Sequence, residues 1–94
     1  MSWTVSFTRS AKEQLAAIPD KQRQLILAWI GKNLQGCANP RTVDGSKQIK
    51  GTESGWRYRV GSYRILAKLL DGELVIEVVR VGHRQGVYNN LPKL

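Results

Sequence analysis

The chain has 94 residues, and its 15 lysines and arginines outnumber its 7 acidic residues, which gives a formal net charge of +8. This length predicts one domain over residues 1–94, and a hydrophobic content of 41% excludes a disordered basic tail. The excess positive charge should therefore lie on a folded surface, whose usual partners are nucleic acid or anionic lipid.

The first predicted element is a short strand, and a helix follows it. Residues 3–7 alternate between apolar and polar side chains, which predicts a strand that lies on a sheet through one apolar face. Thr8 or Ser10 can cap the helix, whose apolar stripe consists of Ala11, Leu15 and Ile18. Pro19 and Asp20 end this helix and begin the next one.

The second helix is predicted to end at Gly36. Its apolar residues recur at spacings of three and four, at Ile26, Trp29, Ile30 and Leu34. The two helices should therefore form a hairpin that packs on the sheet. Residues 36–45 contain Asn39-Pro40 and Asp44-Gly45 and have the composition of a surface loop.

The remainder of the chain has the pattern of consecutive strands. Residues 47–50 form a possible edge strand, and residues 56–60 alternate clearly. Gly61-Ser62 suits a type II′ hairpin turn and Asp71-Gly72 a type I′ turn. We therefore predict an α+β fold in which an N-terminal strand and a two-helix hairpin precede a mainly antiparallel sheet of three to four strands.

These two turns predict which side chains share a face of the sheet. One face should be covered by the helices; it collects Trp56, Tyr58, Val60, Tyr63, Ile65, Ala67, Leu69, Leu74, Ile76 and Val78, with Arg80 at its end. The other, termed here the basic face, collects Arg57, Arg59, Arg64, Leu66, Lys68, Val75, Glu77 and Val79.

Arg59 should lie directly opposite Arg64 on the basic face. Like charges opposed in this way destabilise a sheet by up to about 1 kcal/mol, so the pair favours a bound anion. A solvated surface that only keeps the protein soluble is the alternative. Because the predicted register also places Val79 opposite Arg64, the residues that follow, His83, Arg84 and Tyr88, should reach the basic face and complete a phosphate site.

Several other kinds of site are not expected. Glu77 is the only carboxylate predicted on the basic face, and the single cysteine, Cys37, has no partner for a disulfide, so we expect no metal and no other cofactor. No glycine-rich phosphate loop or pair of catalytic carboxylates occurs. The start of the chain lacks a signal-peptide pattern, and the longest apolar run, residues 25–30, is too short to span a membrane. We expect a cytoplasmic protein.

The sequence resembles the RelE branch of the RelE/ParE toxin superfamily, the ribosome-dependent mRNA endonucleases of bacterial toxin–antitoxin pairs. The resemblance covers nearly the whole chain and is strongest at residues 47–51, 55–66, 81–84 and 87–88. It implies cleavage of mRNA in the ribosomal A site, in which a ribose 2′-oxygen attacks the adjacent phosphate without a cofactor.

The resemblance also implies roles for individual residues. Arg59, Arg64, Arg84 and Tyr88 match catalytic or basic positions of the family, and Arg57 matches a basic strand position. Some members carry lysines where this chain has Arg57 and Arg59, and a guanidinium is a poor general base. Histidine is the residue type best suited to acid–base work near neutrality, so His83 is the predicted acid or base. Together with Arg57, the lysines Lys47, Lys50 and Lys68 are expected to bind RNA.

The partners implied are mRNA, the ribosome and a cognate antitoxin, which would wrap the helices, block the basic face and form a hetero-oligomer with the toxin. Two alternatives stay open. One is a ParE-like inhibitor of DNA gyrase, and the other is a noncatalytic RNA-binding module.

Overall fold

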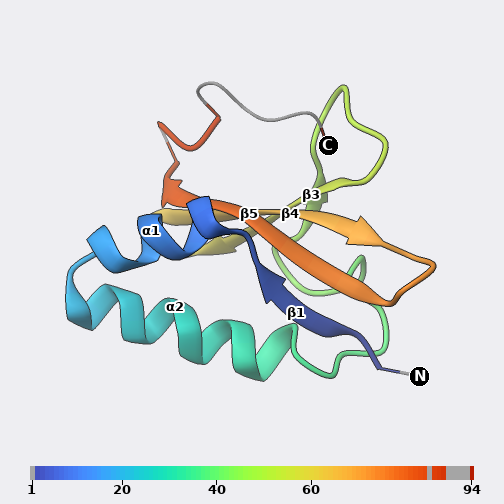
Figure 1. Cartoon of the computed structure of the whole chain (residues 1–94), viewed down its shortest axis with the longest axis horizontal. Coiled ribbons are helices and arrows are strands. Elements are labelled where there is room, and N and C mark those ends of the chain that lie inside the picture. The colour runs from blue at the N-terminus through green and yellow to red at the C-terminus, as the bar shows by residue number, and fades with distance from the viewer. Residues whose placement is uncertain (1, 85, 89–93) are drawn as a thin grey trace.

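The computed structural model describes residues 2–84, 86–88 and 94. The elements in chain order are β1 (Thr4–Phe7), α1 (Arg9–Ala17), α2 (Asp20–Asn33), β2 (Lys47–Gln48), β3 (Gly55–Val60), β4 (Tyr63–Leu70) and β5 (Val75–His83). The helices lie against one face of a five-stranded sheet (Figure 1). The α+β fold with an N-terminal strand and a helical hairpin is confirmed, and β1 adds a parallel strand to the four antiparallel ones.

The sheet has the order β1-β5-β4-β3-β2. β1 pairs in parallel with β5, and the long connection between them contains both helices and the other three strands. The later strands pair antiparallel through β2–β3, β3–β4 and β4–β5. The first strand of the chain therefore lies beside the last one.

The main core lies between the helices and the sheet. Thr8, one of the two predicted caps, accepts a hydrogen bond from the Ala11 amide at 3.1 Å at the start of α1. The apolar stripes of both helices are buried against the sheet, which confirms their predicted direction. The buried members of the main core are Trp3, Ala11, Leu15, Ile18, Ile26, Ile30, Leu34, Tyr58, Ile65, Ala67, Leu69, Ile76, Val78 and Val81.

The first predicted hairpin is confirmed. Gly61 has a φ of +60°, as the first central residue of a type II′ turn requires. Arg59 therefore lies directly opposite Arg64.

The predicted two-residue turn of the second hairpin is wrong. Leu70 pairs with Val75, so the connection contains the four residues from Asp71 to Leu74. The Leu74 carbonyl accepts a hydrogen bond from the Thr4 amide at 2.9 Å, and the Leu74 side chain packs against the main core. These contacts with distant residues stabilise the wider turn.

A β-bulge in β5 changes the register a second time. Ala67 lies opposite Val78 while Leu66 lies opposite Arg80, so Val79 is an extra residue in β5. Beyond it, Arg80 shares the face of Leu66, and Val81 enters the main core. Two predictions are thereby corrected: Arg80 does not end the helix-covered face, and the residue opposite Arg64 is Gly82 instead of Val79.

The loop between α2 and β2 ties three parts of the fold together. The buried Tyr58 hydroxyl donates to the Pro40 carbonyl at 2.8 Å. Arg41 donates two hydrogen bonds of 2.9 Å to the Asp71 carboxylate and lies 5.6 Å from the ring centre of Trp56. The loop thus links β3 to the β4–β5 turn.

Among the residues described, no helix is long and apolar enough to cross a membrane.

Candidate functional site

The basic face begins with residues that the strands hold side by side. Arg57 and Arg59 alternate along β3 and so project from the same side, away from the helices. Lys47 of β2 pairs with Arg57, and Arg64 of β4 pairs with Arg59. Four cations from three strands therefore share one surface.

Arg64 is held close to the hairpin turn. Its Nη1 donates to the Gly61 carbonyl at 3.1 Å and to the Tyr63 carbonyl at 3.0 Å. The pKa of the Arg64 guanidinium is lowered, mainly by burial. The positive charges of Arg59, Arg57 and Arg84 lower it further. The positive groups therefore repel one another, and an anion bound among them would relieve the repulsion.

A second, smaller hydrophobic cluster lies on this same side of the sheet and is termed the small core. Ile49, Leu66, Val79 and Val87 are its buried members. Leu66 and Val79 come from the sheet, whereas Ile49 follows β2 and Val87 follows β5. The small core thus fixes two separate segments beside the arginines.

Backbone hydrogen bonds turn the chain back after β5. The Arg84 amide donates to the Ser62 carbonyl at 3.1 Å, which anchors it to the β3–β4 turn. The amides of Gly86 and Val87 both donate to the His83 carbonyl, at 3.1 and 3.0 Å. This turn brings Val87 into the small core and leaves Tyr88 exposed beside it.

Tyr88 lines a cleft of about 420 Å³. The other lining residues come from β3 and from the segment that starts with β2: Lys47, Gln48, Ile49, Lys50 and Arg57. The cations can bind phosphates, and the exposed phenol ring can stack on a nucleotide base. This arrangement suits a single-stranded polyanion that carries aromatic bases.

The structure therefore brings together most of the predicted site residues: Arg57, Arg59, Arg64, Arg84 and Tyr88, with Lys47 and Lys50 at the cleft. His83 lies elsewhere. It pairs with Tyr63 and stacks on that ring with centroids 4.5 Å apart, on the side of the sheet that faces the helices. Lys68 lies towards the other end of β4, opposite Glu77.

The sequence pattern predicted neither the position of Arg80 on the basic face nor the small core. The bulge that turns Arg80 onto the basic face has no local sequence signal, because Val78 and Val79 are equally suited to either face. A signal for the small core was present in Ile49 and Val87, two apolar residues isolated among polar and glycine neighbours.

Among the described residues, no group of three or more His, Cys, Asp or Glu side chains is placed to hold a metal ion.

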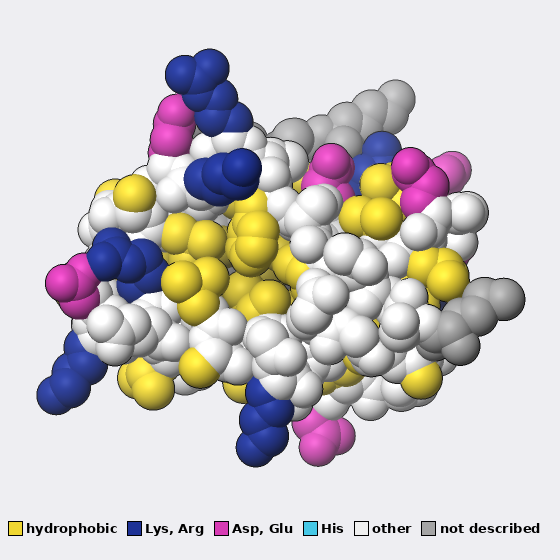
Figure 2. Space-filling model, turned by 60° about the horizontal axis from the view of Figure 1, so that its bottom comes forward, with side chains coloured by type: hydrophobic (Ala, Val, Ile, Leu, Met, Phe, Trp, Pro, Cys, Tyr) yellow, Lys and Arg dark blue, Asp and Glu magenta, His cyan; other side chains and the backbone are white. Residues whose placement is uncertain are grey.

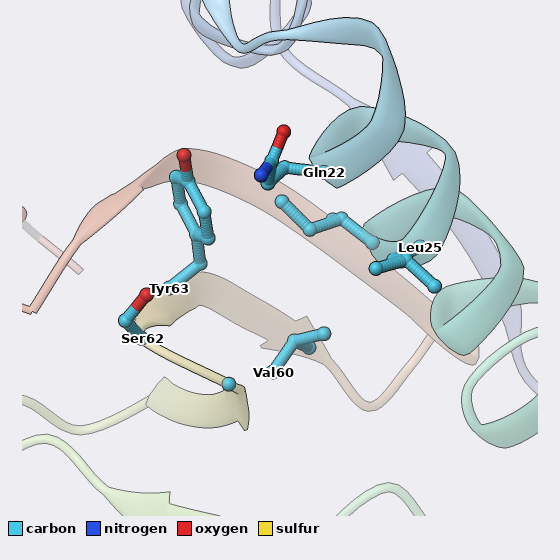
Figure 3. A pocket seen from close by; sticks show the side chains of 7 residues that line it. Gln22, Leu25, Val60, Ser62 and Tyr63 are labelled. Atoms are coloured by element: carbon cyan, nitrogen blue, oxygen red, sulfur yellow. The ribbon is translucent and has the colours of Figure 1, made fainter.

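The opposite side of the molecule carries an apolar groove between α2 and the β3–β4 turn. Its volume is about 170 Å³, and it is lined by Gln22, Leu25, Ile26, Val60, Gly61, Ser62 and Tyr63 (Figure 3). Leu25 is 64% exposed and Leu27, on the same helix, 42%. Figure 2 shows hydrophobic side chains gathered near the middle of the face to which α2 contributes, with lysines and arginines above, below and to the left of them and a few acidic side chains close by.

Comparisons with known proteins agree with this fold. A family model described as the ParE toxin of type II toxin–antitoxin systems matches residues 5–88. A search of the curated proteins found no match.

Solved structures resemble most of the chain. In the RelB–RelE antitoxin–toxin complex from Methanococcus jannaschii, a chain 29% identical superposes with a TM-score of 0.67, over 92% of this chain and 98% of that one. In the RelBE2 toxin–antitoxin complex from Mycobacterium tuberculosis, the identity is 22%, the TM-score 0.72 and the coverage 89% and 100%. In the RelE–RelB complex from Pyrococcus horikoshii, a chain 20% identical superposes with a TM-score of 0.72, over 93% of this chain and 100% of that one. The last two likenesses show a shared fold.

Proposed function

The chain belongs to the ParE toxin family of type II toxin–antitoxin systems, and from this premise we propose that it is a toxin that cleaves mRNA on the ribosome as a metal-independent endoribonuclease. The observation that carries the proposal is the arginine cluster of the basic face. Arg59 and Arg64 directly oppose each other, and the charges of Arg57 and Arg84 also reach Arg64. This repulsion is offset when a phosphate binds there.

The proposed reaction joins the ribose 2′-oxygen to the adjacent phosphorus and breaks the bond from phosphorus to the 5′-oxygen. The products are a 2′,3′-cyclic phosphate and a 5′-hydroxyl, and the proton lost by the 2′-hydroxyl is balanced by the one gained at the 5′-oxygen. Arg64 and Arg84 orient the phosphate and stabilise the negative charge that develops on it. Arg57, Arg59 and the cleft lysines hold the flanking RNA.

We assign proton transfer to Tyr88 in preference to His83. Tyr88 lines the cleft with Arg57 and Lys47, whereas the His83 ring packs on Tyr63 at the helix side of the sheet. A general acid or base must come within hydrogen-bond reach of the proton it moves. His83 is better placed to support the end of β5 than to contact RNA on the basic face.

An antitoxin is the proposed protein partner, in the cytoplasm where ribosomes are found. The three solved structures described above are complexes of toxins with antitoxins. The apolar groove beside α2, with the exposed Leu25 at its edge, suits the apolar face of an antitoxin segment. With a formal net charge of +8 on the toxin, acidic residues on that segment would add attraction.

A second candidate function is inhibition of DNA gyrase, because the matching family model is that of the ParE toxins. The two functions differ in their target and product. An inhibitor of gyrase would block supercoiling without producing new RNA ends. A noncatalytic module would bind RNA in a salt-sensitive way and leave it intact.

The deciding experiment adds the purified toxin to ribosomes translating a defined mRNA and maps new 3′ ends, with free RNA as a parallel sample. We expect cuts at A-site codons. The Arg84→Lys variant should lose at least about a hundredfold in cleavage rate, because an ammonium cannot reproduce bidentate phosphate binding. The melting temperature should stay unchanged, since Arg84 is exposed.

Arg9→Lys, an exposed change on α1, is the matched control and should cleave at the wild-type rate. Intact mRNA in the presence of folded wild-type toxin would contradict the nuclease function, and a gyrase supercoiling assay would then test the second candidate. Full activity of Arg84→Lys would contradict the assignment of the phosphate site.

A further inference from the structure

Arg80 lies on the basic face because of the bulge in β5. The extra residue, Val79, belongs to the small core with Leu66, and Arg80 pairs directly with Leu66. Two consecutive residues of β5 therefore project to the same side of the sheet, which regular strand alternation does not allow. One of them packs in the small core, and the other extends a guanidinium next to it.

The Arg80 side chain reaches the segment that folds back after β5. Its Nη1 donates a hydrogen bond to the Val87 carbonyl at 3.4 Å, in a partly buried position. The Val87 side chain is only 2% exposed and is held in the small core. The Val87 peptide is thus fixed from two sides, by apolar packing of its side chain and by the Arg80 guanidinium at its carbonyl.

Tyr88 follows directly on this fixed peptide. A rotation of the Val87 peptide would displace the Tyr88 ring, which lies in the cleft with Lys47 and Arg57. The backbone turn at His83 fixes Val87 through its amide only, at 3.0 Å. The carbonyl contact from Arg80 supplies a restraint on the side that leads to Tyr88.

We propose that Arg80 is a positioning residue, which holds the Val87 carbonyl and thereby keeps Tyr88 in the cleft beside Lys47 and Arg57. The consequence for catalysis rests on the proposed nuclease function, whereas the effect on the Tyr88 ring does not. Arg80 acts through Val87 and Tyr88 and is not assigned a contact with the reacting phosphate.

The first test observes the ring itself. The full chain is labelled with 3-fluorotyrosine, and ¹⁹F NMR resolves its three tyrosines, with Tyr88→Phe assigning one resonance. Arg80→Met keeps most of the side-chain stem and removes the guanidinium. We expect the Tyr88 resonance to shift towards that of free fluorotyrosine, while the resonances of Tyr58 and Tyr63 stay in place.

Lys12→Met removes one positive charge from an exposed site on α1 and should leave all three resonances unchanged. Arg80→Lys keeps the charge and should cause a smaller shift of the Tyr88 resonance in the same direction as Arg80→Met. It replaces Arg80→Met if that variant does not fold. An unchanged Tyr88 resonance in a folded Arg80 variant would overturn the proposal.

The second test measures mRNA cleavage in a double-mutant cycle. A displaced catalytic group commonly costs tenfold to a hundredfold, so Arg80→Met should lower kcat by about that factor. In a Tyr88→Phe background the same substitution should have little further effect, because both changes act through one ring. An equal loss in both backgrounds would overturn the proposal. If the wild-type toxin does not cleave mRNA, the proposed function fails, and the ¹⁹F measurement still decides the role of Arg80.

Discussion

Single side chains on the basic face differ in how much freedom the fold leaves them. Arg64 is tied to two backbone carbonyls of its own hairpin, at Gly61 and Tyr63. Arg59, directly opposite, is exposed. A guanidinium that is already oriented loses little entropy when it binds a phosphate. In the proposed reaction, Arg64 is therefore suited to the reacting phosphate and Arg59 to a flanking one.

The same residue scale separates Tyr88 from His83. Tyr88→Phe keeps the ring and removes the hydroxyl, and should lower the single-turnover cleavage rate by about a hundredfold if the phenol moves a proton. His83→Asn should lower that rate much less, because the imidazole stacks on Tyr63 on the other side of the sheet. Both rates are measured on ribosome-bound mRNA. A large loss for His83→Asn with a small one for Tyr88→Phe would reverse the assignment.

Among the secondary-structure elements, the β3–β4 hairpin controls the arginine cluster through one glycine. Gly61 has a φ of +60°, and no atom lies within 4 Å of the position a Cβ would take. Gly61→Ala should therefore cost about 1–2 kcal/mol in the free energy of unfolding, from backbone strain alone. Cleavage should also fall, since the Gly61 carbonyl holds Arg64.

A second glycine provides the control for this change. Gly31 lies in α2, is exposed and also has no atom within 4 Å of a Cβ position. Gly31→Ala should stabilise the protein by about 1 kcal/mol, because alanine favours a helix. Urea denaturation of both variants measures the two opposite effects, and effects of the same sign would refute the backbone explanation.

The contact between the α2–β2 loop and the β4–β5 turn predicts a pH dependence of stability. Hydrogen bonds from Arg41 hold the pKa of Asp71 below its ordinary value. A lowered pKa in the folded state adds stability above the pKa of the unfolded chain, about 3.9, and this contribution is lost as the pH falls through the folded pKa. Asp71→Asn should therefore lower the melting temperature at pH 7, and the difference should shrink at about pH 2.

Glu73→Gln, in the same turn, is the control for this experiment and should change the melting temperature less at both pH values. An Asp71→Asn difference that stays constant from pH 7 to pH 2 would show that the carboxylate charge is not responsible.

The sequence predicted the elements and the first hairpin because their signals are local. Amphipathic periods, the Thr8 cap and the Gly61-Ser62 turn are each contained in a few neighbouring residues. The second hairpin and the bulge depend on distant contacts instead. Leu74 accepts a hydrogen bond from Thr4, Asp71 accepts one from Arg41, and Val79 packs in the small core. A register without the bulge puts His83 near the basic face and Arg80 on the helix-covered face, and both placements are wrong.

The whole molecule has two surfaces of different character on opposite sides of the sheet. One carries the arginine cluster and its cleft, and the other the apolar groove beside α2. An antitoxin segment in the groove would leave the basic face to be covered by other parts of the same partner. The two surfaces can therefore be disabled separately.

This separation gives a prediction for complex formation. Leu25→Ser should weaken binding of the cognate antitoxin by about tenfold or more, because it removes an apolar contact at the groove. Leu27→Ser changes an exposed leucine of the same helix that does not line the groove and should have a smaller effect. Isothermal titration calorimetry measures both affinities, and free Leu25→Ser toxin should cleave mRNA normally. Equal weakening by the two substitutions would argue against the groove.

The pairing of β1 with β5 also determines how late in synthesis the fold of the toxin can be completed. Thr4 pairs with Val75, which is translated 71 positions later (75 minus 4). At 5–20 residues per second, β1 waits about 4 to 14 s for its partner. Arg84 and Tyr88 are added later still, so a nascent chain that stalls in β5 has no complete site. The cell thus gains an interval in which an antitoxin already present can meet the helices of the growing toxin before the toxin is complete.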